Sequence, residues 1–142
     1  MDFYNNAFEQ LESAKILAES GKFRVAVTLL CLSGELFLKS LVERKDPNNQ
    51  FLNTHDIVGL GNALKDDVDF NVLAPRLKFL RKYLNDSRYP FDAQVYTKAF
   101  YEECLESILD IQYEVDSANS KKSDVERLSE RFGADSVFSE FQ

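Results

Sequence analysis

The sequence of 142 residues is poor in residues that shape turns and sheets, with only 5 glycines and 3 prolines. It also has a single histidine and two cysteines, far apart in the chain. A zinc site needs three or four clustered ligands, which this set does not supply. The Glu-x-x-His pair of di-iron bundles is absent because Leu52 stands three residues before His55. There is no glycine-rich phosphate loop either, so we expect no metal and no cofactor.

An excess of positive charge is also lacking, since the net charge at pH 7 is −7. Duplex binding depends on neutralising phosphates, so this charge excludes a nucleic-acid-binding surface over the whole protein, although not a local basic pocket. The first residues have no basic stretch followed by an apolar core, as a signal peptide would. Glu35 and Lys39 interrupt the best apolar run, so we expect no membrane span. Together these absences predict a cytoplasmic protein.

The sequence does contain helical periodicity, because apolar residues recur at three- and four-residue steps in five segments. The first segment runs from about Phe3 to Glu19 and stops at Ser20-Gly21, where glycine favours a helix end. The second, roughly Lys22 to Arg44, is apolar on every side, which is typical of a buried helix. Cys31 lies in this segment and Cys104 in a later one. Both are predicted to be buried thiols that pack as small apolar residues.

Three more helices are predicted after the central one. Thr54 is interpreted as the N-cap of a short third helix, with Asp56 in its first turn. A fourth helix carries a leucine stripe and accommodates Pro75 in its first turn. The fifth is long, with Asp92 as its cap and an apolar stripe from Tyr96 to Val115.

These patterns predict an all-α fold, namely an antiparallel bundle of four to five helices around a buried central helix. We assign the bundle to residues 1–118. Residues 119–142 are more polar and are predicted to form a C-terminal appendage, helical near Asp124 to Arg131.

Two of the polar features that could bind a ligand are charged or titratable side chains near the central helix. Glu35 and Lys39 lie one turn apart on the otherwise apolar second segment. Buried charges are costly unless paired, so one interpretation is a structural ion pair. The other is that they face a cleft and meet a ligand. His55, at a helix start, either packs there or donates a proton or contacts a phosphate.

The third feature is a basic segment from Arg76 to Arg88, in which Lys78 and Lys82 fit a solvated helix face. Arg88 differs because Tyr89 and Pro90 follow it directly. A guanidinium beside an aromatic ring can bind a carboxylate or phosphate in a bidentate manner while the ring stacks on a base. Arg88 and Tyr89 are therefore candidate ligand-binding residues, and exposure to solvent is the alternative.

The order and spacing of these features resemble the HEPN domain, whose name abbreviates higher eukaryotes and prokaryotes nucleotide-binding. The resemblance covers about Phe3 to Val115. The segments that carry it are, in order, Ser20-Gly21-Lys22-Phe23, Ala26, Glu35-Leu36-Phe37-Leu38-Lys39, Thr54-His55-Asp56 and Asp86-Ser87-Arg88-Tyr89-Pro90.

The resemblance implies a helical bundle, often a symmetric homodimer, with a groove near the loop between the last two core helices. One set of the family consists of metal-independent endoribonucleases, often toxins, in which an arginine is followed after four to six residues by a histidine. Here Ala93, Gln94 and Val95 stand at those positions after Arg88, so the general acid-base group is missing. The other set keeps the Arg-Tyr-Pro form and is associated with nucleotide binding or with nucleotidyltransferase partners. This chain is similar to the second set.

From this resemblance we expect a non-catalytic homodimeric domain that binds a nucleotide or other anionic ligand, a nucleotidyltransferase partner, or both. It implies that Arg88 and Tyr89 line the groove, with Glu35, Lys39 and His55 as neighbours. Two alternatives stay open. One is an RNA-cleaving toxin that uses His55 in place of the missing histidine. The other is a pure protein–protein interaction module.

Overall fold

The computed structural model describes residues 2–86 and 96–132, with side chains over 2–81 and 96–121. Within these residues every regular element is helical, which confirms the predicted all-α fold. The elements are α1 (Phe3–Glu19), α2 (Phe23–Lys45), the 3₁₀ helix η1 (Gln50–Asn53), α3 (Ile57–Ala63), α4 (Phe70–Asp86) and α5 (Lys98–Phe132).

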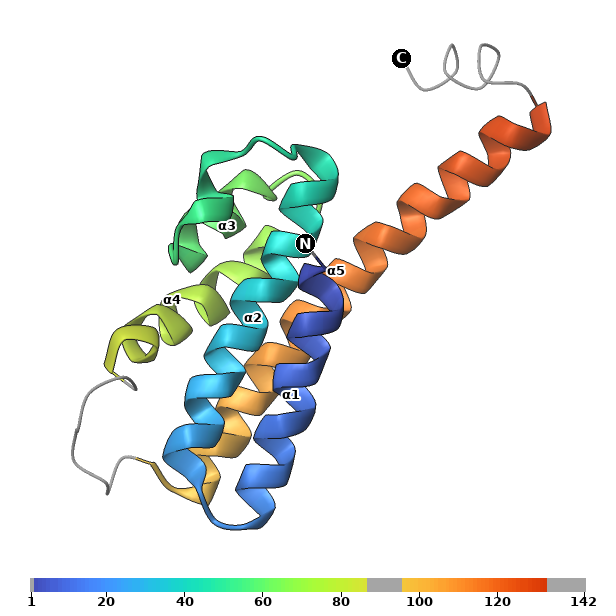
Figure 1. Cartoon of the computed structure of the whole chain (residues 1–142). Coiled ribbons are helices and arrows are strands. Elements are labelled where there is room, and N and C mark those ends of the chain that lie inside the picture. The colour runs from blue at the N-terminus through green and yellow to red at the C-terminus, as the bar shows by residue number, and fades with distance from the viewer. Residues whose placement is uncertain (1, 87–95, 133–142) are drawn as a thin grey trace.

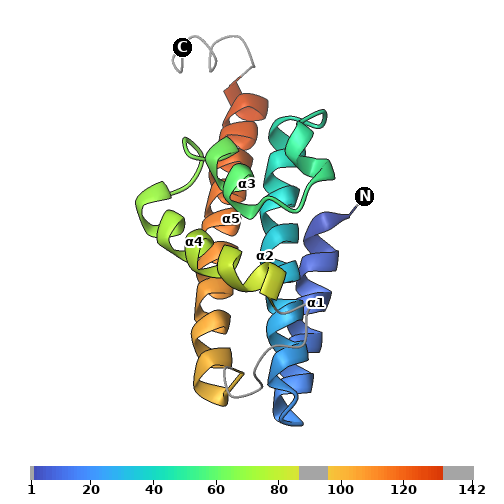
Figure 2. The same ribbon diagram turned by 90° about the vertical axis from the view of Figure 1, so that its left-hand side faces the viewer.

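The long helices form a bundle around α2, as the sequence predicted. Successive long helices alternate in direction, so that α2 and α5 run the same way while α1 runs opposite to them (Figure 1). Helix α4 crosses the bundle obliquely, and α3 and η1 lie at the end where α2 finishes (Figure 2). Helix α2 contacts α1, α3, α4, α5 and η1. It is therefore the element on which the others assemble.

Most residues of α2 are buried, as its uniform apolar character predicted. Phe37 is fully buried, whereas Val25 near the start of the helix is 49% exposed. Gly34 marks a close approach to α5, because a Cβ there would lie 2.8 Å from Cδ1 of Ile108. The buried side chains of this helix pack with those of α1, α3, α4 and α5 in one apolar core.

Length and hydropathy alone would allow α2 to cross a membrane, and no other helix in the described part of the chain has this property. Glu35 and Lys39 do interrupt its apolar run, and the absence of a membrane span stays a prediction. In the fold, other helices bury most of α2. The core helix of a bundle can be as long and as apolar as a membrane span, so this property fits the observed fold. The cytoplasmic location stays a prediction.

The ends of α1 follow the sequence closely. Asp2 caps it by accepting a hydrogen bond from the backbone N–H of Asn5 at 3.0 Å and a second one from the side-chain amide of Asn5. Both hydrogen bonds lower the pKa of the Asp2 carboxyl. At the other end Gly21 has φ +76°, a conformation that glycine adopts without steric strain. The Tyr4 hydroxyl donates to Asp116 of α5 at 3.0 Å. Burial and this carboxylate raise the pKa of Tyr4.

Two predicted details at helix starts are wrong. Asp56, not Thr54, is the N-cap of α3, because its carboxylate accepts from the Gly59 N–H at 2.9 Å. Pro75 lies inside α4, beyond its first turn. The helix begins earlier than the leucine stripe indicated, since the Asp69 carbonyl already accepts bonds from Val72 and Leu73.

Helix α5 is longer than the sequence pattern predicted. It continues without a break to Phe132, whereas we expected helix in this region only near 124–131. Asn119, Ser120 and Lys121 include no glycine or proline to end the helix. The Asn119 side chain also accepts from Arg44 of α2 at 2.9 Å. The division of the chain into 1–118 and 119–142 stays a prediction.

Both cysteines are buried and have free thiols, as predicted. Cys31 lies on α2 and Cys104 on α5. Burial raises the pKa of the Cys104 thiol, and the nearby Cys31 adds to this effect. A buried thiol that resists ionisation is a weak nucleophile, so Cys104 acts as a packing residue.

Candidate functional site

A groove of about 640 Å³ runs along one face of α2. The start of α1 forms one wall, and η1 with its flanking connections forms the other. Its volume lies in the range typical of small-molecule sites. The residues that line it are Phe3, Leu32, Glu35, Leu36, Lys39, Glu43, Pro47, Asn48, Asn49, Leu52, Asn53 and His55.

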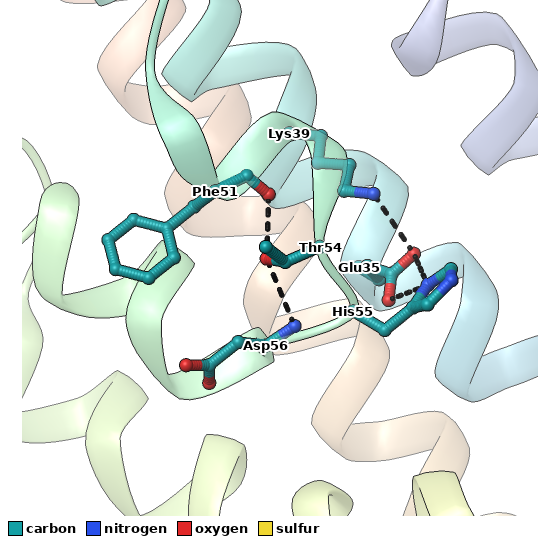
Figure 3. A network of polar contacts seen from close by, with 6 residues as sticks. All are labelled: Glu35, Lys39, Phe51, Thr54, His55 and Asp56. Carbon is teal, nitrogen blue, oxygen red and sulfur yellow. Dashed lines mark hydrogen bonds and ion pairs between the residues drawn. The ribbon is translucent and has the colours of Figure 1, made fainter.

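A buried carboxylate organises the polar part of this groove. Glu35 is only 1% exposed. Its two oxygens lie 3.0 and 3.2 Å from Nδ1 of His55, and Nζ of Lys39 lies 3.4 Å from Oε2. Figure 3 shows the imidazole and the ammonium reaching the same carboxylate. The predicted ion pair of Glu35 and Lys39 is therefore present, and it also borders a groove.

The tautomer of His55 follows from this arrangement. An ionised carboxylate only accepts hydrogen bonds, so Nδ1 of His55 carries the hydrogen. Its other ring nitrogen, Nε2, makes no contact with Glu35. The side chain of His55 is 64% exposed, in contrast to that of Glu35. Of the two nitrogens of the imidazole ring, Nε2 is therefore the one that is available to a ligand.

Lys39 has hydrogen-bonding capacity that the described residues do not use. Its side chain is 8% exposed, and its ammonium has three N–H donors. Among residues 2–81 and 96–121, Glu35 is its only charged neighbour within ion-pair distance, and that 3.4 Å contact is long for a charge-assisted hydrogen bond. A buried donor without an acceptor is costly, so an acceptor oxygen in the groove would stabilise Lys39.

The segment after η1 places His55 over α2. The hydroxyl of Thr54 donates to the Phe51 carbonyl at 3.0 Å, and its oxygen accepts from the Asp56 N–H at 3.4 Å (Figure 3). The ring of Phe51 packs on Gly59 of α3, where a Cβ would lie 2.4 Å from a ring carbon. Glycine at this position therefore lets η1 approach α3 and sets the path of the chain through His55.

The structure brings together three of the five predicted site residues: Glu35, Lys39 and His55. The other two, Arg88 and Tyr89, lie outside the described residues. In the basic segment, Arg76 forms an ion pair with Asp110 of α5 at 2.8 Å, and Lys78 is exposed. No group of three metal-ligating side chains occurs among the described residues.

The groove is completed by residues that were not among those predicted from the sequence. Glu43 continues the line of Glu35 and Lys39 at four-residue steps, so its position was available from the sequence. Asn48 and Asn53 carried no such signal, because Asn48 lies in the turn after α2 and Asn53 at the end of η1, and the position of both segments against α2 depends on tertiary packing.

The sequence matches the HEPN domain family over residues 1–129. With this coverage, the chain belongs to the HEPN domain family, as the resemblance indicated. No curated protein and no solved structure matches the chain.

Proposed function

We propose that this HEPN domain binds a nucleotide, or another anion bearing phosphate, in the groove between α2 and η1. The observation that supports the proposal is the buried ammonium of Lys39, which lines the groove and has donors without acceptors among the described residues. Phosphate oxygens are strong acceptors that match such donors. A phosphate at this position would offset the cost of burying Lys39.

His55 adds a second contact to the same phosphate. Because Glu35 occupies Nδ1, protonation of His55 places a hydrogen on Nε2 and turns it into a donor. Arg88 and Tyr89, which lie outside the described residues, belong to the proposal as two further ligand-binding residues. The protein acts in the cytoplasm as a homodimer, with a nucleotidyltransferase as the proposed partner.

Titration calorimetry with ATP and GTP tests the proposal. We expect binding by the wild type and at least tenfold weaker binding by Lys39→Met and by Arg88→Ala, because a hydrogen bond to a charged group contributes about 1.5–3 kcal/mol. His55→Gln changes an exposed position and tests the same groove without removing the buried ammonium. Lys15→Met is the matched control, since Lys15 lies on α1 outside the groove.

Absence of binding by the wild type would contradict the proposal, as would equal binding by all variants. If only Arg88→Ala weakened nucleotide binding, the ligand would have to bind outside the α2–η1 groove. Light scattering of the same samples tests the homodimer, which should have twice the 16.3 kDa mass of the chain.

Metal-independent RNA cleavage is a second candidate, favoured by the contact between Glu35 and His55. A buried carboxylate that holds Nδ1 of a histidine is the arrangement that orients catalytic histidines in hydrolases. Nε2 can then take up or donate a proton. Under this candidate, incubation of single-stranded RNA with the protein and EDTA gives cleavage that falls at least a hundredfold in His55→Ala. Intact RNA with the wild type would eliminate it.

A further inference from the structure

We propose that the groove selects among nucleotides by their bases, through Glu43, and that it prefers guanine. This inference rests on the proposed function, because it takes the phosphate to be held at Lys39 and His55. It adds a second contact, at the other end of the groove, that recognises the base.

Glu43 is a second acidic residue along the groove. It lies one turn beyond Lys39 on α2, about 6 Å further along the helix axis. It is half-buried and lines the groove, and it has no hydrogen-bond or ion-pair partner within the described part of the chain. Unlike Glu35, whose charge is matched by Lys39, this carboxylate has an unmatched negative charge.

The charges along α2 therefore define two ends of the groove. Lys39 and His55 form a donor end, and Glu43 forms an acceptor end. The Lys39 ammonium and the His55 imidazole both reach the Glu35 carboxylate. From Glu35 to Glu43 the helix rises about 12 Å, which is the scale of one mononucleotide. A purely anionic ligand such as a free polyphosphate is repelled by Glu43. A ligand that fits both ends carries a phosphate at one end and N–H donors at the other.

Nucleobases differ in the donors that they offer to a carboxylate. Guanine presents two adjacent donors on its Watson–Crick edge, N1–H and the exocyclic N2 amine, which match the two oxygens of a carboxylate in a bidentate pair. Adenine and cytosine present an amine beside a ring acceptor. Uracil presents one N–H between two carbonyl groups, whose oxygens a carboxylate repels. The expected order of affinity is guanine first and uracil last.

The side chains around this end are compatible with a base. Leu52 of η1 lines the groove and provides apolar surface for a ring face, whereas Leu36 lies nearer the donor end, one residue after Glu35 on α2. Asn48 lines the same end, and its side-chain amide has no hydrogen-bond partner among the described residues. An amide N–H there can donate to O6 of guanine, which adjoins N1.

Titration calorimetry of the full chain with GMP, AMP, CMP and UMP tests the inference. The wild type should bind GMP about tenfold more tightly than UMP, since one bidentate contact to a base provides discrimination of this size. Glu43→Gln should bind GMP about tenfold more weakly and lose most of the preference over UMP. Glu9→Gln, an exposed position on α1, is the matched control and should retain the wild-type order.

The possible failures are distinguishable. Equal affinities of the wild type for GMP and UMP would overturn the inference while Lys39-dependent binding still supported the proposed function. A preference for GMP that persists in Glu43→Gln would likewise overturn the role of Glu43. Absence of binding of all four nucleotides by the wild type would overturn both.

Discussion

Replacing Lys39 with methionine is expected to lower the free energy of unfolding by about 3 kcal/mol. Methionine has a similar length and is apolar, so the packing volume is nearly conserved. The loss comes from Glu35, whose carboxylate is 1% exposed and would keep only His55 as a partner. Removing one member of a buried ion pair leaves a charge in a poorly solvated position. Urea denaturation followed by circular dichroism measures the difference.

A double substitution separates this electrostatic loss from a loss of packing. Glu35→Gln removes the buried charge, so Lys39→Met combined with Glu35→Gln should recover about 2 kcal/mol relative to the sum of the single changes. Lys15→Met is the control, because Lys15 pairs with Glu12 on an exposed helix face and contributes less than about 1 kcal/mol. Strictly additive single changes would show that Glu35 and Lys39 do not interact in solution.

Replacing Gly34 with leucine is expected to lower the free energy of unfolding by about 3 kcal/mol. The Cβ position at Gly34 already lies 2.8 Å from Ile108 and 3.3 Å from Ile111, both on α5 and both fully buried. A four-carbon side chain cannot fit without separating α2 from α5. Thermal unfolding should show a midpoint lower by roughly 10 °C.

Two milder substitutions test whether the close approach of α2 and α5 causes this loss of stability. Gly34→Ala adds one carbon and also raises helix propensity by about 1 kcal/mol, so its net effect should be much smaller than that of leucine. Val25→Leu, at a position on α2 that is 49% exposed, should leave the midpoint nearly unchanged. A Gly34→Leu protein as stable as the wild type would contradict the close approach of α2 and α5.

Much of the fold could be predicted because helices leave local signals. The limits of α1 follow from its apolar stripe and from Gly21, and the central position of α2 follows from its uniform apolar character. Errors occurred where local signals compete. Both Thr54 and Asp56 are good N-caps, and only the hydrogen bond to Gly59 distinguishes them.

The candidate site was predictable only in part. Glu35 and Lys39 share a helix face, so their ion pair follows from the four-residue spacing. The contact of His55 with Glu35 joins residues 20 positions apart, and nothing in the periodicity of either segment encodes it. Glu43 could have been found by extending the same spacing by one more turn.

The sequence by itself determined the number of long helices, the burial of α2 and the membership of the HEPN family, because periodicity and short motifs are local properties of the chain. Only the tertiary structure decided that η1 folds back over α2 and brings His55 onto the Glu35 carboxylate. The physical reason is that the path of this connection is set by packing, here the Phe51 ring against Gly59, and packing between distant segments has no local signature.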